Sequence, residues 1–509
     1  MLAKVKSAGI FGVEGYMIDV EVDISNGLPV FDIVGLPDIS IRESKERVRA
    51  AIKNSGFEFP IKRITVNMAP ADTKKEGPAF DLAIAVGILI ATGQIPIMDN
   101  LDPIFLGELS LDGTLKPISG VLPMLLSIRD ENNAVVLPYE NAKEASNVSG
   151  VTVYPCRTLA ELVESFKNGS GPLPYKRTSS NSAVFKPSFE DDFSDVKGQN
   201  GAKRALEVAA AGGHNIILMG PPGSGKTMLA KRLPTILPDL SYEEALEITK
   251  VYSVAGMLKE KEGIVDIRPF MSPHHTISSS ALVGGGRIPT PGQISLAHHG
   301  VLFLDELLEF KKDVLEVLRQ PLEDGEITIS RAQGTAVFPC KFMLVASLNP
   351  CPCGYWGDAD HECTCTPNEI RRYLGKISGP LLDRFDIHIE VPSLSFQKIS
   401  GNEKAESSES IRERVNRARE RQVLRYKEEG VFYNAQLSPK QIRKHCKMDN
   451  YGKNLMENAY TAMKLSARAY DRILKVSRTI ADLEGSDNIE ANHIAEAIQY
   501  RSLDRQYWG

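Results

Sequence analysis

The sequence has no long hydrophobic run and no export signal. Its longest nearly uninterrupted apolar stretch, Leu82 to Ala91, is about half the length of a membrane-spanning helix and therefore predicts a buried helix. Glu14 and Asp19 interrupt the segment in which a secretory signal would place its apolar core. We therefore expect a cytoplasmic protein without membrane contacts.

The sequence also lacks an excess of one charge and a paired cysteine framework. The 60 Lys and Arg residues nearly balance 65 Asp and Glu, and a formal net charge of −5 argues against a protein that coats nucleic acid. Contact with DNA or RNA would need local basic patches. The seven cysteines are odd in number and four fall within 351–365, which favours a metal site over disulfides.

The 509 residues suggest about three domains. A Gly-, Ser- and Pro-rich segment predicts a linker at 167–188. Strand and helix patterns alternate within 1–166 and again within 189–392, whereas only helical patterns continue in 393–509. In the first part the predicted strands are 17–24, 63–67 and 134–137, and the predicted helices are 41–54, 81–92 and 160–166.

The strongest motif is a complete Walker A sequence. It reads Gly220, Pro221, Pro222, Gly223, Ser224, Gly225, Lys226 and Thr227. An apolar strand (215–219) precedes it and a helix (228–233) follows, so backbone N–H groups can surround phosphates at a helix N-terminus. We expect Lys226 to bridge the β- and γ-phosphates of ATP and Thr227 to hold Mg²⁺.

Two further strands end in polar residues that suit hydrolysis. The strand 301–304 leads to Asp305 and Glu306, the Walker B form, in which Asp305 completes the Mg²⁺ shell and Glu306 deprotonates the attacking water. The strand 342–348 leads to Asn349. Its amide suits contact with the γ-phosphate or the water, although an Asn before proline is equally typical of a turn.

This order of motifs, followed by LLDRFD at 381–386, resembles that of an AAA+ ATPase. The resemblance implies that Asn349 is sensor 1 and that Arg384 is an arginine finger for a neighbouring subunit. Arg468 would be sensor 2 on a helical lid, with Arg472 as a second choice. A finger supplied in trans implies a ring, which we expect to be a homo-hexamer. The alternative for Arg384 is a surface salt bridge with Asp383 or Asp386.

Finer motifs narrow the resemblance to the magnesium-chelatase-like AAA+ proteins of the YifB/ComM family. These motifs are SPHHT (272–276), GGGRIP (284–289), PGQISLAHHG (291–300), NPCPCG (349–354), GLPD (35–38) and NMAPAD (67–72). The likeness thus extends over essentially the whole chain. It implies a ring-forming ATPase and, for the ComM members, a DNA helicase that drives branch migration in natural transformation.

Four cysteines form two CxC pairs across a short polar loop. They are Cys351, Cys353, Cys363 and Cys365. Four thiolates so arranged can close tetrahedrally on a structural Zn²⁺ and hold a loop that is too polar to be stabilised by burial. Reduced thiols on a flexible loop are the alternative, and His361 is a substitute ligand. A metal here would also brace Asn349.

In the N-terminal part, GPAFDL (77–82) and LGELSLDG (106–113) resemble the proteolytic domain of Lon proteases. Ala79 stands at the position of the Lon nucleophile and Leu122 at that of its lysine, and neither side chain can do that chemistry. The expected fold is multidomain α/β: a non-catalytic Lon-protease-like α+β domain, an AAA+ P-loop α/β core and an all-helical lid.

Two segments are expected to form hairpins that face the pore of a ring. The first, 281–292, carries Arg287, and the second, 326–339, carries Arg331 and Gln333 at its tip. Arginines on such hairpins can follow a phosphate backbone, although both can equally be ordinary surface hairpins. The arginine-rich helix 411–427 is more typical of a solvated face.

Two hypotheses follow. The first is an ATP-hydrolysing hexameric motor that translocates on single-stranded or branched DNA and promotes homologous recombination of incoming DNA. The second is a magnesium-chelatase-like or protein-remodelling ATPase without DNA activity. The ATPase half rests on the motif residues themselves, and the DNA half rests on the family resemblance and the two hairpins.

Overall fold

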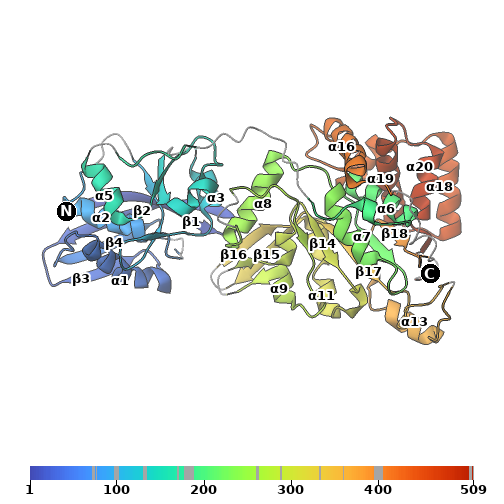
Figure 1. Cartoon of the computed structure of the whole chain (residues 1–509), viewed down its shortest axis with the longest axis horizontal. Coiled ribbons are helices and arrows are strands. Elements are labelled where there is room, and N and C mark those ends of the chain that lie inside the picture. Colours follow the sequence, from blue (N-terminus) through green and yellow to red (C-terminus); the bar gives the residue numbers. More distant parts are fainter. Residues whose placement is uncertain are drawn as a thin grey trace.

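The computed structural model describes residues 1–71, 75, 77–96, 102–129, 134–168, 171–176, 189–258, 263–286, 289–331, 334–358, 360–394, 405–503 and 507. They form an elongated mixed α/β molecule with one sheet at the N-terminal end, a second sheet in the middle and a group of helices at the C-terminal end (Figure 1). Most of the predicted linker, Arg287 and Gln333 lie outside the described residues. None of the described helices combines the length and the apolarity that crossing a bilayer requires.

The N-terminal sheet has seven strands in the order β3-β4-β2-β1-β5-β8-β9. It is mixed, because β1 pairs antiparallel with β2 and parallel with β5. The strands are β1 (Leu2–Phe11), β2 (Glu14–Ser25), β3 (Val30–Val34), β4 (Arg63–Ala69), β5 (Ile104–Phe105), β8 (Ala134–Pro138) and β9 (Thr152–Cys156), beside a small ribbon of β6 (Glu108–Leu109) and β7 (Leu115–Lys116). The helices are α1 (Ile39–Asn54), α2 (Asp81–Ala91), α3 (Val121–Ile128), α4 (Ala142–Ala145) and α5 (Leu159–Lys167).

Helix α2 is the predicted buried helix, and the structure confirms it. Every residue of α2 except Ile90 is buried. Gly87 allows α2 to approach β2, because a Cβ at this position would lie 2.6 Å from a methyl group of Val22. The fully buried carboxylate of Asp81 is compensated by Arg47 at 2.7 Å. A buried carboxylate is thus tolerated at the start of an apolar helix because a half-buried guanidinium pairs with it.

The middle sheet has five strands in the order β11-β14-β17-β10-β18, and its recorded pairs are parallel. The strands are β10 (Ile216–Met219), β11 (Phe270–Met271), β14 (Val301–Leu304), β17 (Met343–Leu348) and β18 (Ile387–Glu390). All residues of β10, β14 and β17 are buried, which explains their continuous apolar sequences. The helices around it are α6 (Asn200–Gly212), α7 (Lys226–Arg232), α8 (Tyr242–Val254), α9 (Ser279–Val283), α10 (Gln293–Leu296), α11 (Lys312–Glu316), α12 (Arg319–Asp324), α13 (Pro367–Leu374) and α14 (Gly379–Leu382).

Two antiparallel ribbons form where the sequence predicts hairpins, and their orientation toward a pore stays a prediction. The first ribbon pairs β12 (Gly284–Gly285) with β13 (Thr290–Pro291), and the second pairs β15 (Glu326–Arg331) with β16 (Gly334–Pro339). The second ribbon lies in the chain between the strands β14 and β17. The connection from β16 to β17 is short, whereas α11 and α12 lie between β14 and β15.

The described residues after Pro392 contain helices and no strand, as the sequence predicts. These helices are α16 (Ser408–Arg425), α17 (Pro439–His445), α18 (Asn450–Met463), α19 (Ala467–Leu483) and α20 (Ala491–Gln499). One apolar cluster runs from Leu206 on α6 to Ile411 on α16 and Ile473 on α19. The C-terminal helices therefore share a hydrophobic core with the middle sheet.

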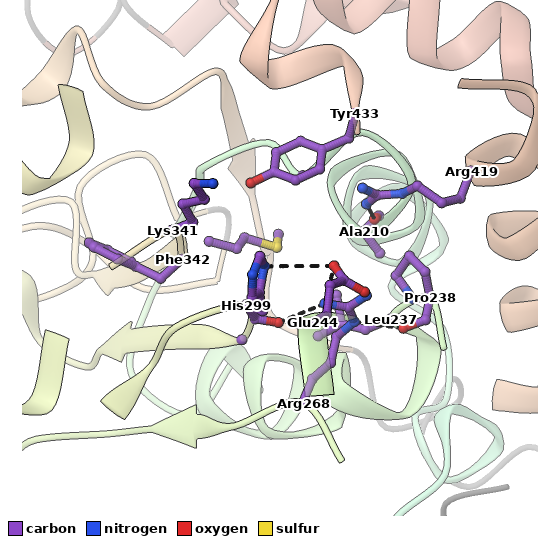
Figure 2. Close-up of a pocket in the computed structure, with 13 residues that line it drawn as sticks. Ala210, Leu237, Pro238, Glu244, Arg268, His299, Lys341, Phe342, Arg419 and Tyr433 are labelled. Carbon is purple, nitrogen blue, oxygen red and sulfur yellow. Dashed lines mark hydrogen bonds and ion pairs between the residues drawn. The ribbon is translucent and has the colours of Figure 1, made fainter. Parts of the chain in front are cut away.

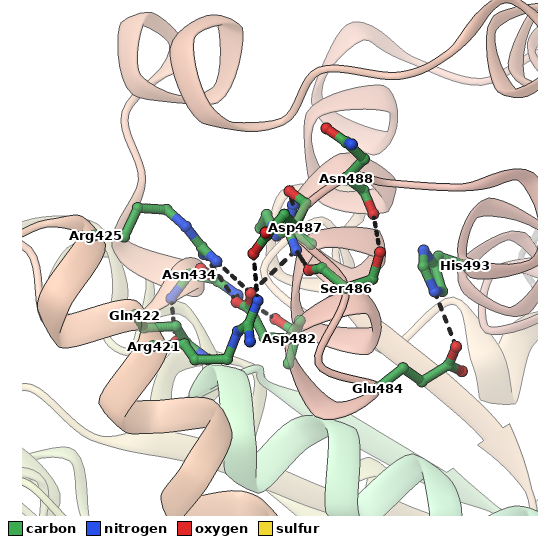
Figure 3. A network of polar contacts seen from close by, with 12 residues as sticks. Arg421, Gln422, Arg425, Asn434, Asp482, Glu484, Ser486, Asp487, Asn488 and His493 are labelled. Atoms are coloured by element: carbon green, nitrogen blue, oxygen red, sulfur yellow. Dashed lines mark hydrogen bonds and ion pairs between the residues drawn. The ribbon is translucent and has the colours of Figure 1, made fainter.

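Asp482 on α19 is the centre of a buried polar network (Figure 3). Its carboxylate accepts hydrogen bonds from Arg425 at 2.5 and 3.0 Å and from Asn434 at 2.9 Å, and it pairs with Arg478 at 3.1 Å. Arg425 belongs to the arginine-rich helix. The interpretation of that helix as a solvated face is therefore wrong for this residue, which joins α16 to α19.

Replacing Asp482 with Asn should destabilise the C-terminal helices strongly, because two guanidinium groups would lose their shared carboxylate. We expect a loss of about 3–5 kcal/mol in the free energy of unfolding. Asp487→Asn is the matched control, since the Asp487 side chain is 92% exposed and its pair with Arg421 should contribute less than about 1 kcal/mol. Denaturant unfolding followed by circular dichroism measures both changes. Equal losses would contradict the assignment.

Candidate nucleotide site

Three motifs meet at one edge of the middle sheet because their strands are parallel neighbours. Met219 at the end of β10 pairs with Leu348 at the end of β17, and Leu304 at the end of β14 pairs with Ala346. The glycine-rich loop, the acidic pair and Asn349 follow these ends directly. The register therefore brings together the motifs that the sequence predicts for one site.

The glycine-rich loop needs glycine for space and for backbone conformation. A Cβ at Gly220 would lie 2.1 Å from the carbonyl oxygen of Val391, and Gly225 has φ 93° where helix α7 begins. The hydroxyl of Ser224 is buried and has no hydrogen-bond partner among the described residues. The loop thus holds a free polar group beside a helix N-terminus, an arrangement that suits a phosphate oxygen.

The side chain of Lys226 folds back onto the glycine-rich loop. Its ammonium donates to the carbonyl oxygens of Gly220 at 2.7 Å and Pro221 at 2.8 Å, and to the side-chain oxygen of Asn349 at 3.1 Å. Burial lowers the pKa of Lys226 to about 8, although nearby carboxylates act in the opposite direction. The contact with Asn349 means that this amide faces the loop and does more than close a turn.

Asp305 links the glycine-rich loop to β17. It accepts a hydrogen bond from the Thr227 hydroxyl at 2.9 Å and a short one from the Ser347 hydroxyl. Ser347 also accepts from the backbone N–H of Glu306 at 3.2 Å. The hydroxyl of Thr227 beside a carboxylate fits the oxygen ligands that Mg²⁺ prefers. Sequence reasoning missed Ser347, whose only signal is a polar residue inside an otherwise apolar strand.

Glu306 has its carboxylate on the open side of the site. Its side chain is 61% exposed, and its backbone adopts φ 52°, which turns it away from the line of β14. The Nδ1 atom of His275 lies 3.9 Å from its Oε2. His275 follows β11, the parallel neighbour of β14, so both residues lie at the same edge. The sequence identifies His275 only as part of a family motif and does not predict this contact.

Arg384 is paired within its own chain. Its Nη2 lies 2.6 Å from Glu323 Oε2. The alternative partners suggested by the sequence, Asp383 and Asp386, are wrong, because they pair with arginines of α19. Asp386 Oδ1 lies 3.1 Å from Arg472, and the two oxygens of Asp383 lie 3.8 Å from Arg468 and 4.0 Å from Arg472.

Arg384 and Arg468 lie at the edge of the sheet opposite to Lys226. Asp386 immediately precedes β18, whereas the glycine-rich loop follows β10, and these two strands are parallel with Ile216 paired to Ile387. Four residues of extended strand separate the two edges by roughly 13 Å. The Arg468 side chain is 61% exposed, whereas the Arg472 side chain is only 13% exposed and forms an ion pair with Asp386. Neither Arg384 nor Arg468 therefore adjoins the nucleotide loop of its own chain.

The four cysteines of the CxC pairs gather as predicted. Their sulfur atoms all lie within 4.8 Å of one another. The measured separations are 3.3 Å for Cys351–Cys353, 3.7 Å for Cys351–Cys363 and 3.6 Å for Cys353–Cys363. A tetrahedral zinc site with Zn–S bonds of about 2.3 Å places sulfurs about 3.8 Å apart, so the donor set fits Zn²⁺. His361 instead stacks on Tyr355, with ring centroids 4.7 Å apart.

The cysteine loop packs directly on the nucleotide loop. A Cβ at Gly354 would lie 2.5 Å from the Pro222 side chain. Trp356 of the same loop contacts Tyr507 edge to face, with ring centroids 4.9 Å apart. A metal in this loop would therefore stabilise Pro222 as well as the neighbouring Asn349.

A second cluster of potential ligands comprises Glu247, His298 and His299. The Nδ1 atom of His298 accepts the backbone N–H of Lys341 at 3.0 Å, so its Nε2 carries the proton and donates to Glu247. A metal would need that Nε2 lone pair. Burial lowers the pKa of His298 to about 4, which fits a neutral ring in a hydrogen-bonded cluster.

The two ribbons lie side by side. A Cβ at Gly284 would lie 3.1 Å from Ile329, and one at Gly285 would lie 3.2 Å from the Arg331 guanidinium. Arg331 is exposed. Arg287 and Gln333 fall outside the described residues, so only Arg331 of the three predicted DNA contacts is placed.

The positions compared with the Lon catalytic residues are apolar and inaccessible. Ala79 is 6% exposed and Leu122 is fully buried. Both belong to one hydrophobic cluster of the N-terminal sheet and its helices. They serve packing in this chain.

A parallel sheet with a glycine-rich loop after one strand and an acidic pair after its near neighbour defines the P-loop nucleotide-binding class. Three family models match, namely "Magnesium chelatase, subunit ChlI" at residues 192–399, "Subunit ChlI of Mg-chelatase" at 20–141 and "Magnesium chelatase, subunit ChlI C-terminal" at 405–501.

Competence protein ComM of Haemophilus influenzae is 46% identical over 507 residues, covering 99% of this chain and 98% of the relative. The uncharacterized protein YifB of Escherichia coli is 42% identical over 509 residues, covering 99% and 98%. Lon protease 2 of Bacillus subtilis is 26% identical over 168 residues, covering 30% of each chain. The chain therefore belongs to the YifB/ComM family of magnesium-chelatase-like AAA+ proteins.

Purified protein should contain one zinc ion per chain by elemental analysis. Cys363→Ser removes one of four ligands and should weaken zinc affinity by at least about tenfold, so the purified variant should contain less zinc. Cys156→Ser is the control, since Cys156 is a buried thiol of the N-terminal sheet. Metal-free wild-type protein, or full zinc content in Cys363→Ser, would rule out the site.

Proposed function

We propose that the protein is an ATP-hydrolysing AAA+ ring motor that acts on DNA as a helicase or branch-migration factor. One observation carries the ATPase part of the proposal: at one sheet edge, Lys226 donates a hydrogen bond to Asn349, and Thr227 donates one to Asp305. This is the arrangement that binding a nucleoside triphosphate with Mg²⁺ requires. The magnesium ion would neutralise charge that develops on the phosphates.

Each side chain then has a separate task. Lys226 leaves the loop carbonyls to contact the β- and γ-phosphates, while Thr227 and Asp305 hold the ion. Glu306 accepts a proton from water, whose oxygen forms a bond to the γ-phosphorus as the bond to the ADP oxygen breaks. Asn349 orients the γ-phosphate, and Ser347 keeps the Asp305 carboxylate directed at Thr227.

The position of the arginines supports assembly into a ring. Arg384 and Arg468 lie at the opposite edge from Lys226, so a guanidinium can reach a nucleotide only where a second subunit abuts that edge. We assign Arg384 as the finger and Arg468 as sensor 2, both acting on the adjacent subunit, in a homo-hexamer. Arg472 is instead committed to Asp386 within the chain.

Two ribbons beside each other supply the proposed DNA contact. Arg331 is exposed at the end of β15, and the β15–β16 ribbon connects the Walker B strand to the Asn349 strand. Hydrolysis can therefore move Arg331, and with it a bound phosphate backbone. Arg287 and Gln333 are proposed as further contacts from their sequence positions. The full-length similarity to a competence protein supports DNA taken up in natural transformation as the substrate.

The remaining assignments follow from this function. We propose a non-catalytic Lon-protease-like domain at 1–166, a linker at 167–188, an AAA+ core at 189–392 and a helical lid at 393–509, in a cytoplasmic protein with structural zinc. A magnesium-chelatase-like or protein-remodelling ATPase without DNA activity is the second candidate, because the three family models carry the name of a chelatase subunit.

DNA should stimulate ATP hydrolysis by the wild-type protein, and DNA binding should weaken steeply with salt. If each of six subunits contributes one phosphate contact, the log–log slope against salt concentration is about −4 for single strands. Lys226→Ala is the control and should bind DNA without hydrolysis. Absence of both stimulation and salt dependence would favour the second candidate, and a branch-migration assay then tests the motor directly.

Arg384→Ala should lower the rate of ATP hydrolysis by about 10³-fold or more while nucleotide affinity stays within a few-fold. Glu323→Gln is the matched control, because it removes the ion pair of Arg384 within the chain and leaves the guanidinium in place. Its hydrolysis rate should remain near that of the wild type. Equal losses in both variants would mean that Arg384 serves only the intrachain pair.

A further inference from the structure

The N-terminal part (residues 1–166) contacts the ATPase core along α8 and at the β15–β16 ribbon. Along α8, it packs through α3 and through the segment that includes Glu144 and Asn147, and Asn147 accepts a hydrogen bond from the Tyr242 hydroxyl at 2.7 Å. At the ribbon, it packs through the turn that joins β1 to β2. Figure 1 shows α3 beside α8 and the end of β1 beside β15 and β16. These contacts involve no residue of the proposed nucleotide site, so they do not take part directly in nucleotide binding.

The first contact is polar and centres on Glu144, which is 8% exposed. Its carboxylate accepts hydrogen bonds from the Ser253 hydroxyl at 2.5 Å and the Leu122 backbone N–H at 3.0 Å. The backbone carbonyl oxygen of Ser253 also accepts a hydrogen bond from the backbone N–H of Gly120 at 3.2 Å. Burial raises the pKa of Glu144, although the hydrogen bonds act in the opposite direction. Both the side chain and the backbone of Ser253, in the last turn of α8, are thus bonded to the N-terminal part.

Helix α8 is also fixed to the core on its other side. Glu244 pairs with Arg268 at 2.8 Å, and Arg268 donates to the carbonyl oxygen of His299 at 2.8 Å (Figure 2). Glu247 accepts from His298 at 3.0 Å and from His299 at 2.7 Å. These contacts hold α8 against the segment just before β14. Because Glu144 binds the end of the same helix, it fixes the position of the N-terminal part relative to the core.

The second contact is apolar and closely packed. Phe11 and Val13 are half-buried against the hydrophobic cluster that contains the second ribbon. A Cβ at Gly334 would lie 2.6 Å from the Phe11 ring, and one at Gly12 would lie 3.4 Å from Ala336. Gly334 pairs with Arg331, the proposed DNA contact. The ring of Phe11 therefore lies on the backbone at the end of the ribbon that carries Arg331.

We propose that Phe11 is a positioning residue for the β15–β16 ribbon. The Glu144–Ser253 contact holds the N-terminal part on α8, and the β1–β2 turn then supports the ribbon at Gly334. A two-stranded ribbon alone is marginally stable in water, so a fixed support defines the direction in which Arg331 projects. The inference rests on the proposed function only where it concerns DNA, since the packing contact itself is independent of the substrate.

The packing contact is tested by hydrogen exchange on the full-length protein. Phe11→Ala should raise the exchange rate of the ribbon amides at 334–338 by about 3- to 30-fold relative to the wild type. Phe59→Ala is the matched control, because Phe59 packs on Phe31 within the N-terminal part, with ring centroids 5.9 Å apart. Phe11→Leu retains an apolar side chain and serves as a second variant in case Phe11→Ala misfolds. It should give a smaller increase in the exchange rate. Unchanged exchange in folded Phe11→Ala and Phe11→Leu would overturn the inference.

The functional consequence is tested by comparing basal and DNA-stimulated hydrolysis with a single-stranded oligonucleotide. Phe11→Ala should leave the DNA-free rate within about twofold and reduce the stimulation by about 3- to 30-fold, the range expected for coupling through an intervening contact. Phe59→Ala should retain the stimulation. A wild-type protein that DNA does not stimulate would defeat the proposed function, with the exchange experiment still deciding the packing role. Full stimulation in Phe11→Ala would overturn the positioning role.

Discussion

The parallel pairing of β10 with β17 on one side and β18 on the other is the constraint on which the site depends. At the carboxyl edge it places Lys226 next to Asn349. At the amino edge, the side chain of Asn215 accepts the backbone N–H of Leu344 at 2.7 Å and donates to the carbonyl oxygen of Arg384 at 2.9 Å. One residue before β10 thus fixes the neighbouring strands at the end opposite to the phosphate loop, and a register shift would disturb both edges together.

This division into two edges separates the groups to which we assign roles in hydrolysis. The loop and its acids belong to one edge, while Arg384 and Arg468 belong to the other, where Asp383 and Asp386 pair with the arginines of helix α19. Burial alone would raise the pKa of Asp386, but its hydrogen bond with His214 and the charge of Arg472 lower it to about 2. Helix α19 therefore docks on a carboxylate that stays ionised, and this ion pair fixes the amino edge, where the proposed finger Arg384 lies.

The sequence was sufficient to predict what is local. The Walker motifs, Asn349 and the four cysteines are short segments whose chemistry depends on neighbours in the chain, and the structure places each group together. Ser347 and Glu323 were missed because their partners, Asp305 and Arg384, are distant in sequence and meet only through the fold. The same limit applies to the edge strand β3 and to β1, since pairing partners and not local periodicity define their places in the seven-stranded sheet.

Non-local contacts also explain how a chain of small net charge can carry the proposed DNA-contacting ribbon. Arg331 lies beside Gly285 of the first ribbon, and its strand partner Gly334 lies beneath Phe11. Both neighbours supply backbone or aromatic surface and no opposing carboxylate, so the guanidinium is positioned without being neutralised. A positive charge oriented by packing remains available to a phosphate, whereas one oriented by an ion pair must first lose its partner. Glycine at 285 and 334 is therefore as much a part of the proposed contact as the arginine.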